Sequence, residues 1–301
     1  MIWLEFAISP PSQPPPAGGR GLNGYEEIME PQLREFCSQR GLYLDTKGIR
    51  GSAREGKKVT WQDKFGNYHD LDFVIEKDGT DSQRGRPLAF IEAAWRRYTK
   101  HSRNKAQEIQ GAILPIAEKY AWDKPFLGAI LAGVFTEDSL TQMRSSGFKV
   151  VLFPYESIVD SFAVVDVNIA FEEDTPDEDF ERTIEKIECL ESAQRTKLTT
   201  QLLSRNQEIL TRFFGELEAA LDRRIAHIVV IPLHGGHNEF PGIQDAFFFV
   251  QDYDETKAED GVFREYKILV RFSNGDNIEA AFKDKANTLD FLRYVSGEKR
   301  L

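Results

Sequence analysis

Residues 68–110 read YHDLDFVIEKDGTDSQRGRPLAFIEAAWRRYTKHSRNKAQEIQ and contain two short apolar runs, 71–75 and 88–94. The first run carries Asp72 and the second carries Glu92. Short β-branched and aromatic runs bounded by Gly, Asp and Pro are typical of β-strands. A carboxylate in such a strand is costly to bury unless a positive charge compensates it. We therefore expect Asp72 and Glu92, on adjacent strands, to hold a divalent cation jointly.

The composition of the chain bounds the class of protein. A length of 301 residues allows one large domain or two ordinary ones, and 41% hydrophobic with 29% charged residues is typical of a globular protein. No apolar run approaches the roughly 20 residues of a membrane span, so no membrane partner is expected. The two cysteines, Cys37 and Cys189, offer neither a disulfide framework nor a zinc pattern. This usage fits a reducing compartment and predicts a cytoplasmic protein.

The net charge of −11 is unevenly distributed. Residues 40–105 contain 15 Lys and Arg against 9 Asp and Glu, whereas residues 171–189 contain 2 basic against 9 acidic residues. Such asymmetry says more about partners than the total charge does. A basic region around strand carboxylates suits a phosphodiester substrate, although a solvated polar surface has the same composition.

The order of the predicted elements indicates the fold class. Residues 1–24, rich in proline and glycine, are expected to form a disordered leader. Residues 25–160 then show a helical pattern, a hairpin of strands, a further strand, and a helix–strand–helix–strand succession. This order predicts an α/β core, a mixed central sheet flanked by helices.

The remainder of the chain is expected to form two further parts. Residues 161–222 read as an acidic connection followed by a long helical segment, either one helix or a helical pair over 180–221. That segment could cover the core, or it could serve as a dimerisation arm. Residues 223–301 are predicted to form a smaller α+β unit, with a closing helix at 288–294. Its strands are expected at residues 225–232, 246–250, 266–272 and 277–282.

A strand with Asp72, a loop, a strand with Glu92 and then a helix together resemble the core of the PD-(D/E)XK nuclease superfamily, which includes most type II restriction endonucleases. The resemblance assigns Asp72 to the first metal-binding aspartate, with Asp70 as a second ligand or the true one. It assigns Glu92 to the acidic position of the (D/E)XK strand. The lysine of that motif should follow two residues later, where this chain has Ala94.

The helix after Glu92 offers replacements for the missing lysine. Members of the superfamily are known with the lysine or the second acid displaced onto this helix. The resemblance thus implies Lys105, or alternatively Lys100, as the catalytic ammonium, and Glu108 as a displaced acid. The implied cofactor is Mg²⁺, held by Asp72 and Glu92 with Asp70 or Glu108, because this ion prefers carboxylate, water and phosphate oxygens.

Basic residues around these strands are candidates for contact with the DNA backbone. Residues 48–58 form a basic, glycine-bearing loop, and further cations follow Glu92. An ordinary exposed loop, and an ion pair of Asp72 with one of the arginines after Glu92, remain alternatives. The DNA-contacting candidates are Arg50, Arg54, Lys57, Lys58, Arg96, Arg97 and Arg103.

The resemblance implies a Mg²⁺-dependent DNA endonuclease, most simply a type II restriction enzyme. Restriction enzymes of this superfamily commonly act on double-stranded DNA as homodimers, and a protective DNA methyltransferase would be the expected genetic partner. Ala94 motivates a different hypothesis, a non-catalytic nucleic-acid-binding or sensor protein on the same fold. A repair or transposition nuclease would share the site chemistry and differ in the geometry of its substrate.

Overall fold

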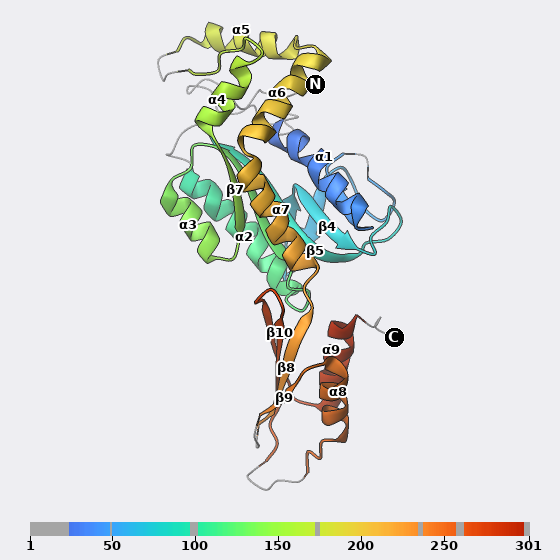
Figure 1. Ribbon diagram of the computed structural model, residues 1–301. Coiled ribbons are helices and arrows are strands. Elements are labelled where there is room, and N and C mark those ends of the chain that lie inside the picture. Colours follow the sequence, from blue (N-terminus) through green and yellow to red (C-terminus); the bar gives the residue numbers. More distant parts are fainter. Residues whose placement is uncertain are drawn as a thin grey trace. The chain divides into compact units, whose positions relative to one another are not determined.

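The computed structural model describes residues 24–48, 50–96, 102–171, 175–233, 237–256 and 262–297 (Figure 1). All but the last residue of the predicted leader therefore lies outside the described residues. The chain divides into two compact units. Unit 1 comprises Met1–Lys119 and Pro125–Glu216, and unit 2 comprises Tyr120–Lys124 and Leu217–Leu301.

Unit 1 is built on a sheet with the strand order β1-β4-β5-β6-β7. Its strands are β1 (Tyr43–Thr46), β4 (Phe73–Lys77), β5 (Arg86–Arg96), β6 (Phe126–Gly133) and β7 (Lys149–Pro154). The pairs β1–β4 and β4–β5 are antiparallel, whereas β5–β6 and β6–β7 are parallel. Strand β6 is buried along nearly its whole length, as its uniformly apolar sequence predicts.

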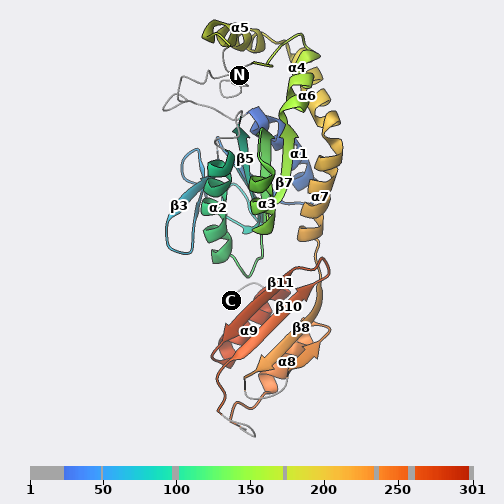
Figure 2. The same cartoon turned by 90° about the vertical axis from the view of Figure 1, so that its left-hand side faces the viewer.

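Helices cover both faces of this sheet. Unit 1 contains α1 (Gly24–Gln39), α2 (Ser102–Lys119), α3 (Glu137–Ser145), α4 (Tyr155–Ala163), α5 (Asp177–Glu188), α6 (Ser192–Arg205) and most of α7 (Gln207–Leu221). Figures 1 and 2 show α2 and α3 on one face and α1 and α7 on the other. Phe36 of α1 and Phe214 of α7 are in ring contact at 5.6 Å. The predicted α/β class, a mixed sheet flanked by helices, is confirmed.

The region predicted as one strand over residues 68–75 is instead divided at Asp72. Residues before the division form β3 (Tyr68–Leu71), which pairs with β2 (Val59–Gln62) in a separate hairpin. Residues after it form β4 of the central sheet. The two halves have different pairing partners, since β2 pairs with the residues before Asp72 and β1 with those after it.

The helical segment is also divided more than expected. In place of one long helix or a pair over residues 180–221, the chain forms α5, α6 and α7. A capping box between Glu191 and Gln194 starts α6. Asn206 ends it, and its side-chain amide donates to Ser157 Oγ of α4 at 2.7 Å and to the backbone oxygen of Leu202 at 2.8 Å. These polar residues interrupt an otherwise continuous helical pattern.

Unit 2 is an α+β unit whose sheet has the order β11-β10-β8-β9. Its elements are β8 (Ile225–Pro232), β9 (Asn238–Phe240), α8 (Ile243–Asp252), β10 (Tyr266–Phe272), β11 (Asn277–Phe282) and α9 (Lys285–Ser296). The strand predicted at residues 246–250 is wrong, because this segment is helical. Ala246 and Val250, one helical turn apart, are both fully buried in the core of unit 2, whereas Phe248 is 57% exposed.

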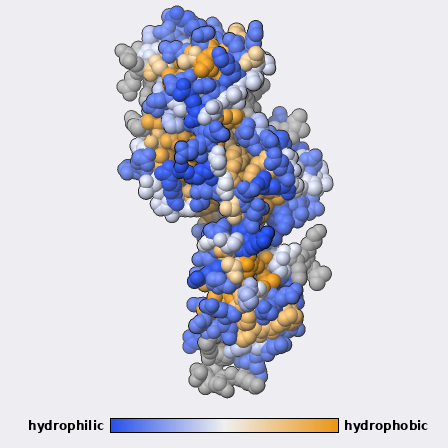
Figure 3. Space-filling view, viewed as in Figure 1, coloured by the Kyte–Doolittle hydropathy of each residue, from blue (hydrophilic) through white to orange (hydrophobic). Residues whose placement is uncertain are grey.

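The surface of the described residues is mainly hydrophilic. On the face shown in Figure 3, hydrophilic side chains predominate and hydrophobic ones form scattered patches, as the 29% charged content predicts. Among the helices of the described residues, none combines the length and the apolar character that crossing a membrane requires.

Candidate active site

Asp72 lies in the break between β3 and β4 and is 3% exposed. Its Oδ1 atom forms an ion pair with Nζ of Lys47, the residue after β1. Its Oδ2 atom accepts a hydrogen bond of 2.7 Å from the backbone N–H of Ala93 on β5. The buried carboxylate thus receives a charge-assisted contact from one neighbouring strand and a backbone contact from the other.

The register of the sheet places Glu92 beside Asp72. Phe73, the first residue of β4, pairs with the last residue of β1 and with Ile91 of β5. Both ladders end at Phe73; if the same register is continued by one residue into the break, Asp72 would lie between Lys47 and Glu92. Directly opposite residues have their Cβ atoms about 5 Å apart and share a face of the sheet. We refer to Lys47, Asp72 and Glu92 as the carboxylate row.

The alternation of β5 shows which elements surround Glu92. Glu92 shares its face with Phe90, whose ring packs edge-on against Trp61 of β2 at 5.5 Å. Arg96 lies on the same face, and its Nη2 atom is 4.0 Å from Oε2 of Glu108 on α2. The carboxylate row therefore faces the side of the sheet occupied by α2 and the β2–β3 hairpin.

The donor set of the row fits a hard divalent cation. Two neighbouring carboxylates repel one another unless a positive charge compensates them, and Lys47 supplies one such charge. Mg²⁺ commonly binds one or two carboxylates and completes its shell with water and substrate phosphate. The described residues contain no group of three or more His, Cys, Asp and Glu side chains able to hold a metal. Asp72 and Glu92 would therefore be the protein's whole contribution.

Lys47 is the residue that sequence reasoning missed. The ammonium expected two residues after Glu92 is absent, and Ala94 there is 3% exposed within the sheet. Lys47 instead reaches Asp72 from β1, with 30% of its side chain exposed. Nothing in the local pattern marks it, because only the pairing of β1 with β4 brings it to the site.

The acids proposed as additional ligands have other partners. Asp70 lies on β3, where its carboxylate binds Nζ of Lys58 at 2.6 Å and Oγ1 of Thr60 at 2.8 Å. Although desolvation acts to raise the pKa of Asp70, these hydrogen bonds lower it overall. Glu108 on α2 is 61% exposed and lies 3.4 Å from Nζ of Lys105. The structure thus brings the predicted pair Lys105 and Glu108 together, next to Arg96.

The arginines after Glu92 have different environments. Arg96 donates to the backbone oxygen of Trp95 at 2.8 Å, and burial lowers its pKa against the opposing effect of Glu108. Arg103 is 66% exposed and lies 3.9 Å from Asp138 of α3. The candidates Arg97 and Lys100 lie outside the described residues. The alternative in which Asp72 forms an ion pair with Arg96 differs from the structure, where Asp72 forms its ion pair with Lys47.

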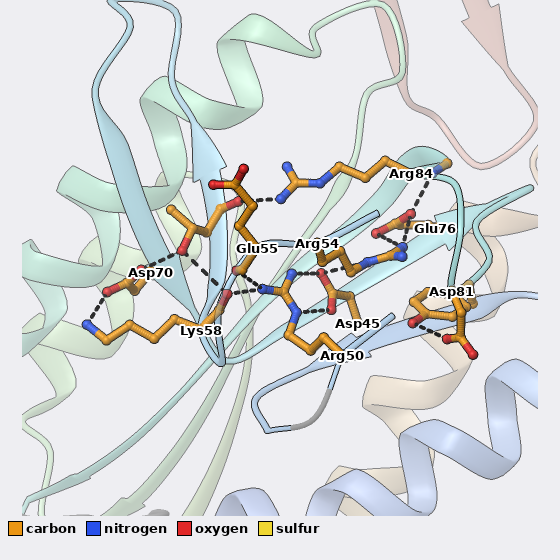
Figure 4. Close-up of polar contacts among 12 residues, drawn as sticks. Asp45, Arg50, Arg54, Glu55, Lys58, Asp70, Glu76, Asp81 and Arg84 are labelled. Carbon is orange, nitrogen blue, oxygen red and sulfur yellow. Dashed lines mark hydrogen bonds and ion pairs between the residues drawn. The ribbon is translucent and has the colours of Figure 1, made fainter. Parts of the chain in front are cut away.

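The side chains of Arg50 and Arg54, from the loop after β1, are buried and bind acids of the central sheet (Figure 4). The two nitrogens Nε and Nη2 of Arg50 bind the carboxylate of Asp45 at 2.8 and 2.5 Å. The Nη2 atom of Arg54 binds both oxygens of Glu76 at 2.8 and 2.7 Å, with neither side chain exposed. Burial raises the pKa of Glu76 despite the opposing effect of Arg54.

This buried network has a structural role that the sequence pattern did not indicate. Asp45 and Glu76 are acids within strands, as Glu92 is, and each is compensated by an arginine from the loop after β1. Because the guanidinium groups of Arg50 and Arg54 are enclosed, we leave them out of the DNA-contacting surface proposed below. Lys57 and Lys58 are exposed and stay candidates for it.

Comparisons with known proteins identify no family for this chain. No family model matches it, and no curated protein does. A solved crystal structure of a protein of unknown function, AF1548, aligns with 63% of this chain and 99% of its own at 10% identity and a TM-score of 0.28. A likeness this low indicates neither a shared fold nor a shared activity.

Proposed function

We propose that this chain is a Mg²⁺-dependent DNA endonuclease that hydrolyses phosphodiester bonds in the manner of a type II restriction enzyme. One observation carries the proposal: the buried Asp72 carboxylate accepts a hydrogen bond from the backbone N–H of Ala93, the residue after Glu92, and forms an ion pair with the ammonium group of Lys47. An acid pair can hold a divalent cation that activates water, and an adjacent ammonium group can stabilise the negative charge of the transition state of phosphodiester hydrolysis.

Each member of the carboxylate row has a distinct task in this reaction. Asp72 and Glu92 would hold Mg²⁺, which polarises a phosphoryl oxygen and acidifies a bound water. The N–H of Ala93 orients the Asp72 carboxylate. Lys47 would donate to a non-bridging phosphate oxygen and would stabilise the negative charge of the transition state. Its partial exposure leaves room for that contact.

The wider proposal follows from the same chemistry. Lys57, Lys58 and Arg103 are exposed cations of unit 1 and would contact the DNA backbone. Cleavage of both strands of a duplex would call for a homodimer, and host protection would call for a cognate DNA methyltransferase. Such an enzyme would act in the cytoplasm.

A second candidate function is nucleic-acid binding without hydrolysis. Two observations favour it: Ala94 stands where the motif lysine is expected, and Lys47 already neutralises Asp72. In this case the row would be a structural ion pair, and the exposed cations alone would bind the nucleic acid.

Cleavage assays with matched variants separate the two functions. Plasmid and genomic DNA, methylated and unmethylated, would be incubated with the protein in Mg²⁺ or in chelator. Discrete fragments that require Mg²⁺ and disappear in Asp72→Asn and Glu92→Gln, but persist in the exposed control Glu279→Gln, would support the endonuclease. Asn can keep the hydrogen bond from Ala93, so folding should survive. Binding without cleavage of any of these DNAs would leave the second candidate.

A further inference from the structure

The turn between β2 and β3 presents two aromatic side chains to solvent. Phe65 is 72% exposed and Tyr68 is 69% exposed. The other exposed large hydrophobic side chains among the described residues are Phe248, at 57%, and Val262, at 83%, both in unit 2. A single exposed apolar residue needs no explanation, but two on one turn form a patch. We refer to Phe65 and Tyr68 as the aromatic tip.

The turn is ordered by Asp63, so that the aromatic tip is held in place. The Asp63 carboxylate accepts hydrogen bonds from the backbone N–H groups of Phe65 and Asn67 at 2.8 and 2.9 Å. It also binds the Asn67 amide at 3.1 Å and Nε2 of His69 at 3.0 Å. A preorganised surface loses less conformational entropy when it binds a partner.

The hairpin is also fastened to α2. The backbone N–H of Lys64 donates to the oxygen of Pro115 at 3.2 Å. Nζ of Lys119 donates to Oε1 of Gln62 at 2.7 Å, and Lys64 forms an ion pair with Glu118. These contacts fix the tip relative to the helix that lies on the face of the carboxylate row.

The aromatic tip and the carboxylate row are joined by β3. Tyr68 begins β3, and Asp72 follows four residues later, in the break after this strand. At about 3.3 Å per residue, four residues of extended chain span roughly 13 Å, a distance that a few nucleotides can bridge. Tyr68 and Asp70 occupy the same exposed side of β3, beside the exposed Lys58.

Several cations lie along the hairpin, and two of them are paired with acids: Lys58 with Asp70 and Lys64 with Glu118. Lys57 and Lys58 lead into β2, Lys64 lies in the turn, and its ammonium is 4.8 Å from the ring of Phe65. Arg84 is exposed beside β2, where it donates to the backbone oxygen of Thr60 at 3.3 Å. Exposed aromatic rings among cations match a nucleic acid with accessible bases, because every base offers a π-face and every nucleotide a phosphate.

We propose that the aromatic tip stacks on unpaired bases within a few nucleotides of the phosphodiester held at the carboxylate row. The substrate class is then DNA with unpaired bases at that position, either single-stranded or opened within a duplex. This inference rests on the proposed function for the position of the cut. The stacking itself requires only binding.

Fluorescence anisotropy tests the stacking in chelator, where no Mg²⁺-dependent cleavage can occur. The probes are labelled single-stranded DNA, a duplex and the same duplex with a four-nucleotide bubble. The wild type should prefer the single strand and the bubble, and Phe65→Ala/Tyr68→Ala should weaken binding to both by about fivefold or more. Phe248→Ala, an exposed aromatic of unit 2, should change nothing. In Phe65→Trp, indole fluorescence should be quenched by the single strand.

Several outcomes would overturn the proposal. Equal affinity of the double alanine variant and the wild type for the bubble would do so, as would a wild type that prefers the intact duplex. Self-association that depends on the aromatic tip, detected by sedimentation, would assign the patch to a second copy of the chain instead. If the protein needs the aromatic tip for binding but cleaves no DNA, the stacking inference stands and the proposed nuclease activity fails. If the protein cleaves DNA but binds it equally well without the tip, the nuclease activity stands and the stacking inference fails.

Discussion

Asp72 is held differently on its two oxygens. The N–H of Ala93 belongs to the sheet and cannot leave, whereas the ammonium of Lys47 lies at the end of a flexible side chain. Lys47 is therefore the contact that can be exchanged when a substrate or a cation arrives, which makes it the most informative position in the row.

Replacing this lysine tests its role directly. Lys47→Met should reduce Mg²⁺-dependent cleavage by about 100-fold, because an electrostatic donor to the phosphate is lost. It should also cost up to about 3 kcal/mol of unfolding free energy, since Asp72 loses its cation although Lys47 is 30% exposed. Cleavage rates and urea unfolding measure the two effects separately. Unchanged cleavage with reduced stability would make Lys47 purely structural.

Arg54 provides a contrasting case, because its pair with Glu76 is enclosed. Arg54→Met should lower the unfolding free energy by about 3–5 kcal/mol, since Glu76 would remain buried without its cation. The exposed pair Arg212 and Glu208 supplies the control, and Arg212→Met should change stability by less than about 0.5 kcal/mol. Urea denaturation measures both. Equal losses of unfolding free energy in Arg54→Met and Arg212→Met would contradict the burial of the Arg54–Glu76 pair.

At the scale of elements, the side chain of Asp63 orders the turn of the β2–β3 hairpin. Hydrogen bonds from His69, Asn67 and Phe65 lower the pKa of Asp63, although desolvation opposes them. A carboxyl group whose pKa is lower in the folded state stabilises that state above its unfolded pKa of about 3.9 and loses this contribution as pH falls.

The hairpin should therefore respond to pH through Asp63. Asp63→Asn should increase hydrogen exchange of residues 59–71 at pH 7, and the difference from the wild type should shrink below about pH 4. Exchange of β6, in the same unit, is the internal reference. A difference that stays constant down to pH 2 would show that the charge of Asp63 has no part in ordering the turn.

The packing of β6 against α7 gives a second test at this scale. A Cβ at Gly128 would lie 2.9 Å from Cγ1 of Ile91 and 3.2 Å from Cζ of Phe213, so Gly128→Ala should destabilise unit 1 by about 1–3 kcal/mol. Gly215 of α7 has open space around it, so Gly215→Ala should stabilise by about 0.5–1 kcal/mol. Thermal unfolding should move in opposite directions for the two variants.

At the scale of the whole molecule, unit 2 combines segments that are distant in sequence. Trp122 packs against Phe282, Phe291 and Tyr294 with ring centroids 5.1–5.8 Å apart. The predicted boundary at residue 223 leaves this tryptophan in the core domain. A helix-to-strand connection gives no sequence signal that it belongs to a different hydrophobic core.

Removing this tryptophan should weaken one unit selectively. Trp122→Ala should destabilise unit 2 by about 2–3 kcal/mol, somewhat less than a fully buried tryptophan, because Trp122 is partly exposed. Hydrogen exchange should increase in β8, β10 and α9, and β5 and β6 should keep their protection. Equal loss of protection in both units would mean that they unfold as one.

The sequence alone determined the elements whose signals are local. The apolar run of β6, the closing helix at residues 288–294 and the acids Asp72 and Glu92 in apolar runs could all be recognised, because each depends on neighbouring residues. Residues 246–250 were an exception, because a short apolar run of one helical turn has no periodicity to separate a helix from a strand.

Only the tertiary structure decided which charges meet. Asp45, Asp72 and Glu76 carry the same local signal, an acid within a buried strand, yet two of them meet arginines and one meets Lys47. That choice depends on the pairing of β1 with β4, between residues about 30 positions apart. The energy of a buried charge is set by the partner that the fold brings to it, and this is why the sequence located the carboxylates but not their cations.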